Sequence, residues 1–160
     1  MKKLLLFCIT TMFISCNSSA QKKEDKKPKT FKVIKSESEW KAELSPEAFY
    51  VLRKAGTERP FTSPLNKNYK EGTYQCAGCN TPLFKSKHKF DSGSGWPSFD
   101  REIKGNVSFS TDYDLGYART EEHCATCGGH LGHVFNDGPK NTTGKRHCIN
   151  GVSLKFVPEK

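Results

Sequence analysis

The spacing of hydrophobic positions changes at about residue 72 of this 160-residue chain. Before that point, Phe49 and Leu52 share one face of a helical pattern. Ser36 and Glu39 have the spacing of a capping box, which predicts a short helix, and Ser45-Pro46 begins a second one. Gly56 is the expected stop of this second helix. We therefore expect two short helices, the second packing on the domain through Phe49 and Leu52.

Beyond Gly72, short β-prone runs are separated by Gly, Pro, Asn and Asp residues. Polar and apolar residues alternate in Ser108–Thr111 and in Leu154–Val157, as in half-buried strands. The predicted strands are Thr73–Cys76, Leu83–Ser86, Val107–Tyr113, Tyr117–Cys124, His130–Phe135 and Val152–Val157. The pattern predicts one α+β domain over residues 36–160, mainly antiparallel β, with the short helices at its N-terminus.

The first residues have the pattern of an export signal. Met1-Lys2-Lys3 precedes an apolar stretch from Leu4 to Ile14, which is too short to span a membrane. Cys16 then ends a sequence that resembles a bacterial lipobox, and small residues up to Ala20 offer an ordinary cleavage site instead. We expect residues 1–20 to be a signal peptide, with Cys16 lipidated or the cut near Ala20. The expected location is the bacterial cell envelope, as a periplasmic protein or a lipid-anchored lipoprotein.

Positive charge is concentrated in the N-terminal 35 residues. The net charge is +9, but residues 1–35 contain nine Lys and two acidic residues, whereas residues 36–160 contain 17 basic and 15 acidic residues. Residues 21–35 are therefore predicted to be a basic, disordered tether. Because the body carries only +2, we expect no binding to nucleic acid, which requires a basic surface on the folded part. A zinc-dependent binding module without catalysis is the alternative from another functional class.

Four of the seven cysteines form two CxxC pairs, Cys76 with Cys79 and Cys124 with Cys127. Turn-forming residues follow both pairs, so the two turns can present four thiolates to a tetrahedral Zn²⁺ that has no open position for substrate. Disulfides are the alternative in an exported protein, but a bond within a CxxC turn closes only a tiny loop. We favour a structural zinc site that joins two distant hairpins.

The remaining cysteine outside the signal region is Cys148, which follows Arg146 and His147. Such an electropositive setting lowers the pKa of a thiol and favours the nucleophilic thiolate. An inert cysteine in a buried strand is the other interpretation. His130 and His133 could be metal ligands, proton donors or merely polar strand residues, and proton transfer is the sharper option because four thiolates already complete the zinc shell. Strand alternation predicts that they face opposite sides of the sheet. Trp96, in a glycine-rich loop, either lines a pocket or anchors the loop.

Taken together, these segments resemble methionine-R-sulfoxide reductase B, from about Ser36 to Pro158. The motifs that carry the resemblance are Gly95-Trp96-Pro97-Ser98-Phe99, Arg119-Thr120-Glu121, the two CxxC pairs, His130 to Pro139 and Arg146 to Asn150. The resemblance implies a mostly antiparallel domain of two small sheets, with a structural zinc far from the chemistry. It implies Cys148 as the nucleophile. The further catalytic residues it implies are His133, Asn150, Arg146 and Asp137, and the substrate-binding residues are Trp96, His130 and Phe135.

The activity implied is reduction of methionine R-sulfoxide, protein-bound and also free, through a sulfenic acid on Cys148. We expect His133 to supply the proton to the departing oxygen. Many members of the family carry a second cysteine where this chain has Ser94. Regeneration is therefore expected from an external thiol, such as a thioredoxin-like protein, acting on a monomeric enzyme. His147 is a second departure from the family, which frequently has Tyr or Phe at this position. The change could alter the pKa of the thiolate or the fit of the substrate, and the sequence leaves the direction open.

Overall fold

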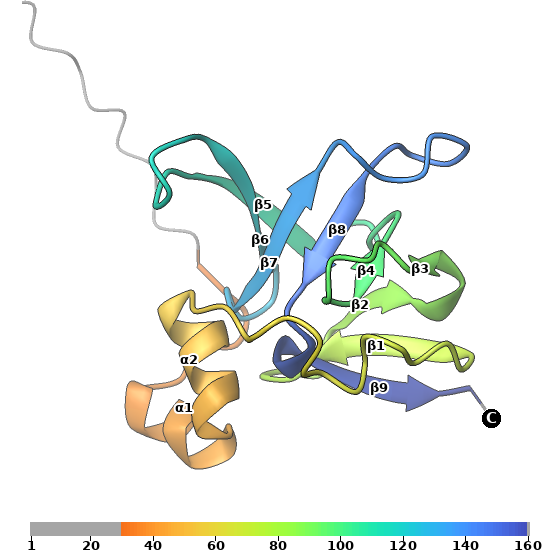
Figure 1. Cartoon of the computed structure of the whole chain (residues 1–160). Helices are drawn as coiled ribbons and strands as arrows, with labels where there is room; N and C mark the ends of the chain where they lie inside the picture. The colour runs from red at the N-terminus through yellow and green to blue at the C-terminus, as the bar shows by residue number, and fades with distance from the viewer. Residues whose placement is uncertain (1–29, 160) are drawn as a thin grey trace, which may run out of the picture.

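The computed structural model describes residues 30–159, in which two helices precede two antiparallel sheets (Figure 1). The helices are α1 (Glu37–Glu43) and α2 (Pro46–Lys54), and the 3-10 turns are η1 (Ser86–His88) and η2 (Gly151–Ser153). The strands are β1 (Gly72–Cys76), β2 (Pro82–Lys85), β3 (Lys89–Phe90), β4 (Ser98–Phe99), β5 (Val107–Asp112), β6 (Arg119–Cys124), β7 (His130–Phe135), β8 (Arg146–Ile149) and β9 (Leu154–Pro158). The predicted signal peptide lies outside the described residues.

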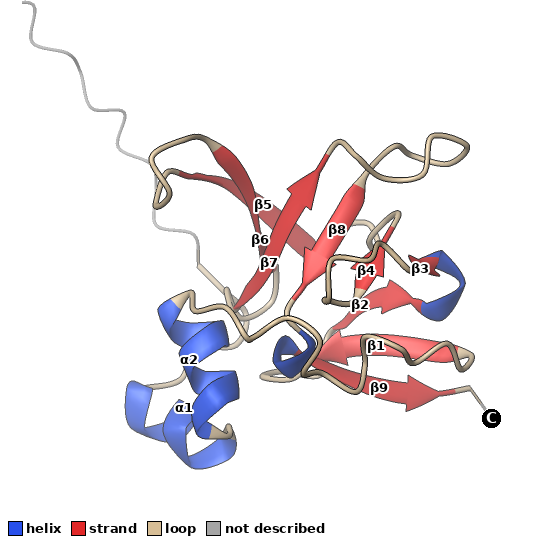
Figure 2. Cartoon of the chain, in the orientation of Figure 1, coloured by secondary structure: helices blue, strands red, loops and turns tan. Residues whose placement is uncertain are grey.

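The strands form a three-stranded sheet in the order β2-β1-β9 and a six-stranded sheet in the order β3-β4-β8-β7-β6-β5 (Figure 2). All pairings are antiparallel, which confirms the predicted fold class. Both helices lie at one end of the molecule, and β9 returns the C-terminus to the side of β1 (Figure 1). Among the described helices, none has the length and apolar character needed to cross a bilayer.

The helices begin where their caps predict. The Ser36 and Glu39 side chains each bond the backbone of the other residue, and the Ser45 hydroxyl accepts the Ala48 N–H. The end of α2 falls at Lys54, two residues before the expected stop Gly56, and the left-handed residue is Ala55 with φ 54°. Gly56 is needed for close approach instead, since a Cβ there would lie 2.1 Å from the Tyr50 ring.

The last residues of the predicted tether, 31–35, contact the folded domain in the structure. The Val33 N–H donates to the Thr126 carbonyl at 3.0 Å, and Phe31 lies against Gly128. The Lys35 ammonium sits 5.0 Å above the centre of the Trp40 ring. These contacts attach residues 31–35 to the second CxxC turn and to α1.

The longer predicted strands are present, with ends displaced by one or two residues. The prediction missed β3, β4 and β8, which are two to four residues long. These strands have too few residues for alternation to be recognised, and they are strands only because neighbouring strands offer a template. The omission matters, because β8 carries Cys148.

A bulge in β7 changes the side on which its residues lie. Glu122 of β6 pairs with Gly132, but the next residue, His123, pairs with His130, so Leu131 has no counterpart. Leu131 is fully buried in the core, while the rings of His130 and His133 lie 5.5 Å apart. The two histidines therefore share one face of the sheet, and the prediction of opposite faces, which assumed unbroken alternation, was wrong.

One core joins the two sheets and the helices. Phe84 of β2 and Phe99 of β4 stack at 4.4 Å between ring centres, and Tyr74 of β1 meets Phe99 edge-on at 4.9 Å. Trp40 and Leu52 bring the helices into the same cluster. As predicted, α2 packs through Phe49 and Leu52. This core holds β7 and β8, where the candidate site lies, in a defined position.

Candidate active site and metal centre

Cys148 lies in the middle of the six-stranded sheet. It pairs with His133 of β7 on one side and with Ser98 of β4 on the other. Gly132 allows this close pairing, because a Cβ there would lie 2.0 Å from the Cys148 carbonyl oxygen. The half-buried thiol opens into a cavity of about 140 Å³, which is lined by Thr57, Trp96, Arg119, Gly132, His133, Phe135, Cys148 and Asn150.

The environment of the Cys148 thiol differs from the sequence prediction. Burial is the largest effect and raises its pKa, whereas the Ser94 hydroxyl, 3.7 Å from the sulfur, and the Arg146 guanidinium lower it. The net direction is upward, so the predicted lowering was wrong. Backbone alternation is the reason that His147 does not help, since consecutive residues of a strand point to opposite faces.

His147 lies beneath the sheet, in the core. Its Nδ1 is 2.6 Å from a carboxylate oxygen of Glu122, which is fully buried, and its ring centre is 5.8 Å from that of Phe84. Burial raises the pKa of Glu122 by more than the bond with His147 lowers it, so the net shift is upward. The departure from the family at this position therefore concerns the packing under β8 and not the substrate side.

His133 is held by a carboxylate that the sequence did not reveal. Its Nε2 lies 2.7 Å from Asp112 Oδ2, and the Arg119 guanidinium bonds the same oxygen. The pKa of Asp112 is lowered to about 2, chiefly by the Asp114 N–H and also by His133 and Arg119. An ionised carboxylate only accepts hydrogen bonds, so the His133 Nε2 carries the proton it shares with Asp112.

Asn150 lines the cavity while its amide bonds the backbone of two other segments. Its side-chain carbonyl accepts the Glu58 N–H at 2.9 Å, and its Nδ2 donates to the Leu131 carbonyl at 3.0 Å. One amide hydrogen is left for a ligand. The Glu58 carbonyl accepts the Trp96 indole N–H at 3.2 Å, and the buried Glu58 carboxylate accepts the N–H groups of Gly151 and Val152.

The remaining predicted residues fall into two groups. Phe135 lines the cavity, and the Arg146 guanidinium stacks 4.4 Å from the centre of its ring. Asp137 is not a cavity residue: its exposed carboxylate forms two 2.8 Å bonds with Arg146. His130 is also outside the cavity, buried behind His133, with its Nδ1 2.5 Å from Glu121 and its Nε2 without a partner among the described residues.

Sequence reasoning missed Asp112, Thr57 and Glu58. No motif marks them, because each reaches the site through tertiary structure: Asp112 ends β5, at the far edge of the sheet from β4, and Thr57 and Glu58 follow α2. Arg119 was singled out only as part of a family motif, and the structure places it in the cavity wall beside Asp112.

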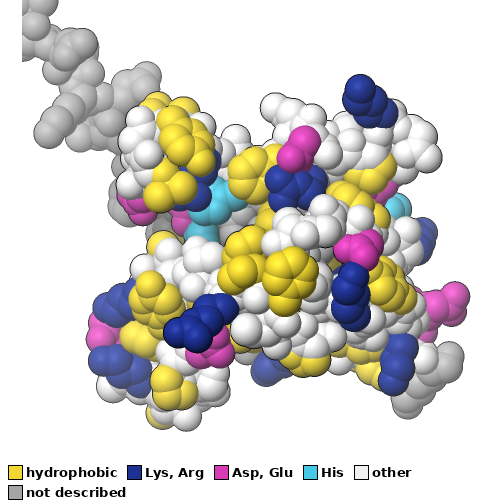
Figure 3. Space-filling model, viewed as in Figure 1, with side chains coloured by type: hydrophobic (Ala, Val, Ile, Leu, Met, Phe, Trp, Pro, Cys, Tyr) yellow, Lys and Arg dark blue, Asp and Glu magenta, His cyan; other side chains and the backbone are white. Residues whose placement is uncertain are grey.

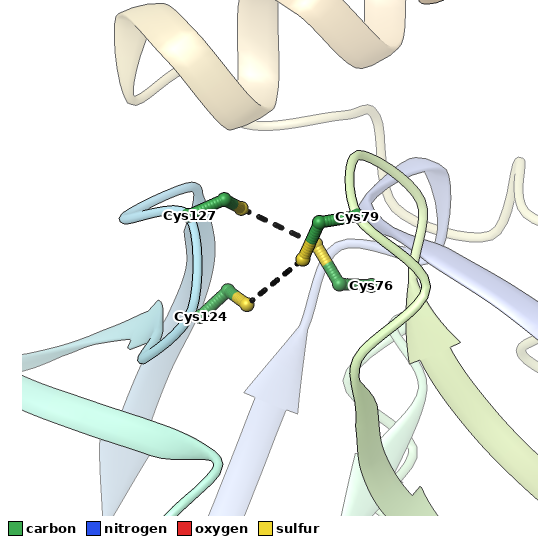
Figure 4. A group of neighbouring side chains, drawn as sticks. All are labelled: Cys76, Cys79, Cys124 and Cys127. Carbon is green, nitrogen blue, oxygen red and sulfur yellow. Dashed lines mark hydrogen bonds between the residues drawn. The ribbon is translucent and has the colours of Figure 1, made fainter. Parts of the chain in front are cut away.

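The four cysteines of the CxxC pairs converge from the two sheets (Figure 4). Cys76 ends β1 and Cys124 ends β6, and all four sulfurs lie within 4.8 Å of one another. The separations of 3.5 Å for Cys79–Cys124 and 3.7 Å for Cys76–Cys127 exceed a disulfide bond. Four thiolates at about 2.3 Å from one ion lie about 3.8 Å apart, so the donor set fits a tetrahedral metal. The cluster could therefore hold a metal ion.

The helices cover this cluster. The Arg53 guanidinium donates to the Cys127 carbonyl at 3.0 Å, and Trp40 packs against Gly78, inside the first CxxC turn. A metal at this place would join the β1–β2 hairpin of the three-stranded sheet to the β6–β7 hairpin of the six-stranded one, which are the two distant hairpins that the sequence analysis proposed to link. The cluster lies in a different part of the fold from the Cys148 cavity, with which it shares no lining residue.

The fold and the site define the class of a thiol oxidoreductase, with one cysteine, Cys148, in a small cavity and a separate four-cysteine cluster. A family model described as the SelR domain matches residues 44–158. A peptide methionine sulfoxide reductase MsrB of Leptospira interrogans is 54% identical, over 81% of this chain and 98% of that protein. The chain belongs to the SelR domain family, the methionine-R-sulfoxide reductase B family that its motifs indicated.

Other relatives cover similar shares. A peptide methionine sulfoxide reductase MsrB of Agrobacterium fabrum is 52% identical over 79% of this chain and 94% of that protein. Peptide methionine sulfoxide reductase B5 of Oryza sativa is 54% identical over 78% of this chain and 90% of that protein. The similarity therefore extends over nearly the whole length of these relatives.

Proposed function

We propose that the chain reduces methionine R-sulfoxide, in peptides and proteins and also as the free amino acid, to methionine. The observation that carries the proposal is the placement of the Cys148 sulfur in a cavity of about 140 Å³ between His133 and the aromatic side chains of Trp96 and Phe135. A cavity of this size accommodates roughly one side chain. The similarity to peptide methionine sulfoxide reductases of Leptospira interrogans and Agrobacterium fabrum supports the same activity.

The chemistry is an oxygen transfer to Cys148. The thiolate attacks the sulfoxide sulfur and forms a sulfur–sulfur bond with it, while the sulfoxide oxygen takes up a proton. The sulfur–oxygen bond of the substrate then breaks, the OH group passes to the Cys148 sulfur, and the sulfur–sulfur bond breaks with its electron pair left on the substrate sulfur, which gives methionine and a sulfenic acid on Cys148. Methionine is the reduced product, and Cys148 is oxidised by two electrons. His133 acts in its doubly protonated imidazolium form: the nitrogen not bonded to Asp112 gives its proton to the sulfoxide oxygen, the Nε2 proton stays with Asp112, and Asp112 keeps the ring in place.

The other residues position the substrate. Trp96 provides an apolar wall for the substrate methyl group, and its indole is fixed by Glu58. Arg146 stabilises the thiolate and is oriented by Asp137. The free amide hydrogen of Asn150 is placed to bond the sulfoxide oxygen. His130 acts through His133, against whose ring it packs.

An external thiol regenerates Cys148. Within residues 30–159, the other cysteines are the four of the cluster, and the hydroxyl of Ser94 lies beside the Cys148 sulfur. One thiol attacks the sulfenic sulfur and releases water, and a second breaks the resulting mixed disulfide. A thioredoxin-like protein is the proposed reductant.

The ion of the four-cysteine cluster is Zn²⁺ in this proposal. Four thiolates at these separations suit zinc, which then has no open coordination position. Cys76, Cys79, Cys124 and Cys127 would hold it, and its contribution is structural, because it joins the two sheets.

The proposed setting is the bacterial cell envelope, where the chain acts as a monomer. The support is the pattern of residues 1–20, with Cys16 in the lipobox-like position or a cut near Ala20. Globomycin, which blocks lipoprotein signal cleavage, together with a Cys16→Ser variant separates the two outcomes. Retention of precursor under globomycin and loss of membrane association in Cys16→Ser support the lipid anchor.

The test of the reductase function is an assay with separated R and S epimers of N-acetylmethionine sulfoxide and dithiothreitol as reductant. We expect reduction of the R epimer alone, and loss of that activity in Cys148→Ser with the fold and metal content retained. Unchanged activity in this variant would reject the assignment and favour the alternative, a binding module without catalysis.

A further inference from the structure

Phe61 combines a left-handed backbone with an aromatic ring that is mostly exposed. Its φ is 65°, in the left-handed region that aromatic residues rarely occupy, and its side chain is 67% exposed. The Phe61 N–H donates to the Gly95 carbonyl at 2.8 Å, which fixes the backbone against the loop that carries Trp96. A strained backbone that holds an aromatic ring in solvent points to a ligand for that ring.

A second group of exposed apolar side chains lies in the turn between β5 and β6. Tyr113, Leu115 and Tyr117 are 67%, 60% and 58% exposed. Single exposed apolar residues are ordinary, but three within one six-residue turn form a patch. The turn follows Asp112, which holds His133, and ends before Arg119, which lines the Cys148 cavity.

The two features belong to the surroundings of the same cavity. Phe61 lies against Gly95, which is next to the cavity residue Trp96, and the β5–β6 turn projects beyond Asp112 and Arg119. In Figure 3, hydrophobic side chains gather over the tip of this hairpin and over the middle of the same face, and a histidine surface lies between them.

The size of the cavity decides what such a surface can contact. At about 140 Å³, it takes in roughly one side chain, so the neighbouring residues of a polypeptide substrate must lie outside it. An extended chain advances about 3.3 Å per residue, which brings the residues next to the methionine over the surroundings of the cavity. The two cationic residues beside the cavity, Arg119 and Arg146, are already paired with Asp112 and Asp137.

We propose that Phe61 and the residues Tyr113, Leu115 and Tyr117, together called the apolar rim, bind the polypeptide on either side of the oxidised methionine. The rim favours extended segments whose residues next to the methionine are apolar. The inference rests on the proposed function and specifies its substrate class. Because the rim adjoins the cavity that receives the methionine side chain, its occupant is the substrate chain itself.

The test compares three R-sulfoxide substrates: N-acetylmethionine sulfoxide, a nine-residue peptide with Leu and Phe beside the methionine, and the same peptide with Ser in their place. The variants are Phe61→Gly and Phe61→Asn, which tolerate the left-handed backbone, and the double variant Tyr113→Ser/Tyr117→Ser. Ile34→Ser is the matched control, since Ile34 is also highly exposed but lies in the segment before α1.

We expect the wild-type chain to have a kcat/KM for the apolar peptide about tenfold above that for the serine peptide. In the rim variants, the ratio of kcat/KM for the apolar peptide to that for N-acetylmethionine sulfoxide falls at least fivefold, and Ile34→Ser keeps the wild-type ratio. Unchanged ratios in both sets of variants overturn the rim. If the rim variants lose self-association in sedimentation experiments but keep the wild-type kcat/KM ratios, the rim is a contact between two copies of the chain. This outcome also overturns the proposal. Failure of the wild type on all three substrates rejects the proposed function instead.

Discussion

The Ser94 hydroxyl lies 3.7 Å from the Cys148 sulfur and is itself bonded to Ser92, whose hydroxyl bonds Ser98. The three hydroxyls form a chain that ends on the nucleophile. In a cavity where burial raises the pKa of Cys148, Ser94 and Arg146 are the groups that favour the thiolate. Ser94 is therefore one of the two groups that oppose the upward shift of the Cys148 pKa caused by burial.

Replacing Ser94 with Ala should raise the pKa of Cys148 further, because a hydrogen bond to the thiolate is lost. The thiolate is the reactive form, so alkylation by iodoacetamide increases as pH rises through this pKa. We expect the alkylation profile to move to higher pH and the single-turnover rate at pH 7 to fall about fivefold, the effect of about 1 kcal/mol. An unchanged profile, checked against the ultraviolet absorbance of the thiolate, would contradict this role of Ser94.

The Ser94→Cys variant should place a second thiol against the sulfenic acid. After one turnover without reductant, we expect an internal disulfide between the introduced thiol and Cys148, detected as loss of two hydrogens in the intact mass. The wild-type chain should instead keep a sulfenic acid that dimedone labels. A disulfide that involves Cys148 in the wild type would argue against regeneration by an external thiol.

Replacing Asp112 with Asn should weaken proton delivery by His133. The amide can orient toward His133 but carries no charge, so we expect a loss in kcat of about tenfold, below the loss of roughly 10²–10⁴ expected for His133→Ala as a missing general acid. Because the pKa of Asp112 is about 2, its ionisation does not contribute to the wild-type pH profile near neutrality. A double variant Asp112→Asn/His133→Ala no slower than His133→Ala would show that the two act together.

Replacing His147 with Phe should destabilise the domain without removing a substrate contact. The change leaves the fully buried Glu122 without its partner, and one half of a buried pair left alone costs about 3–5 kcal/mol. The double variant Glu122→Met/His147→Phe should recover most of this free energy of unfolding, measured by urea denaturation. If His147→Phe alone keeps wild-type stability, the pair has no structural role.

Removal of the metal should unfold the domain, because the proposed role of the metal is structural. We expect one equivalent of zinc in the purified protein and its loss, together with a cooperative loss of tertiary structure, on treatment with a strong chelator. Cys79→Ser should lower the melting temperature and the zinc content. Full retention of the fold after complete metal removal would show that the metal does not contribute to the stability of the domain.

Much of the local structure followed from the chain alone. The caps at Ser36 and Ser45 located both helices, and the alternation of residues located the longer strands. These features depend on neighbours within a few residues, which the sequence contains. The short strands β3, β4 and β8 depend on a partner strand elsewhere in the fold and had no local signal.

Some features of the site could likewise be predicted from the sequence, and others depend on the tertiary structure. The residue types and their spacing determined that two CxxC turns and a single Cys148 were present and which family they belong to. Only the tertiary structure decided that His147 turns into the core, that a bulge at Leu131 places His130 behind His133, and that Asp112 meets His133 from two strands away. Side-chain direction and long-range contact are set by pairing register and packing, so they are properties of the folded chain and not of its local sequence.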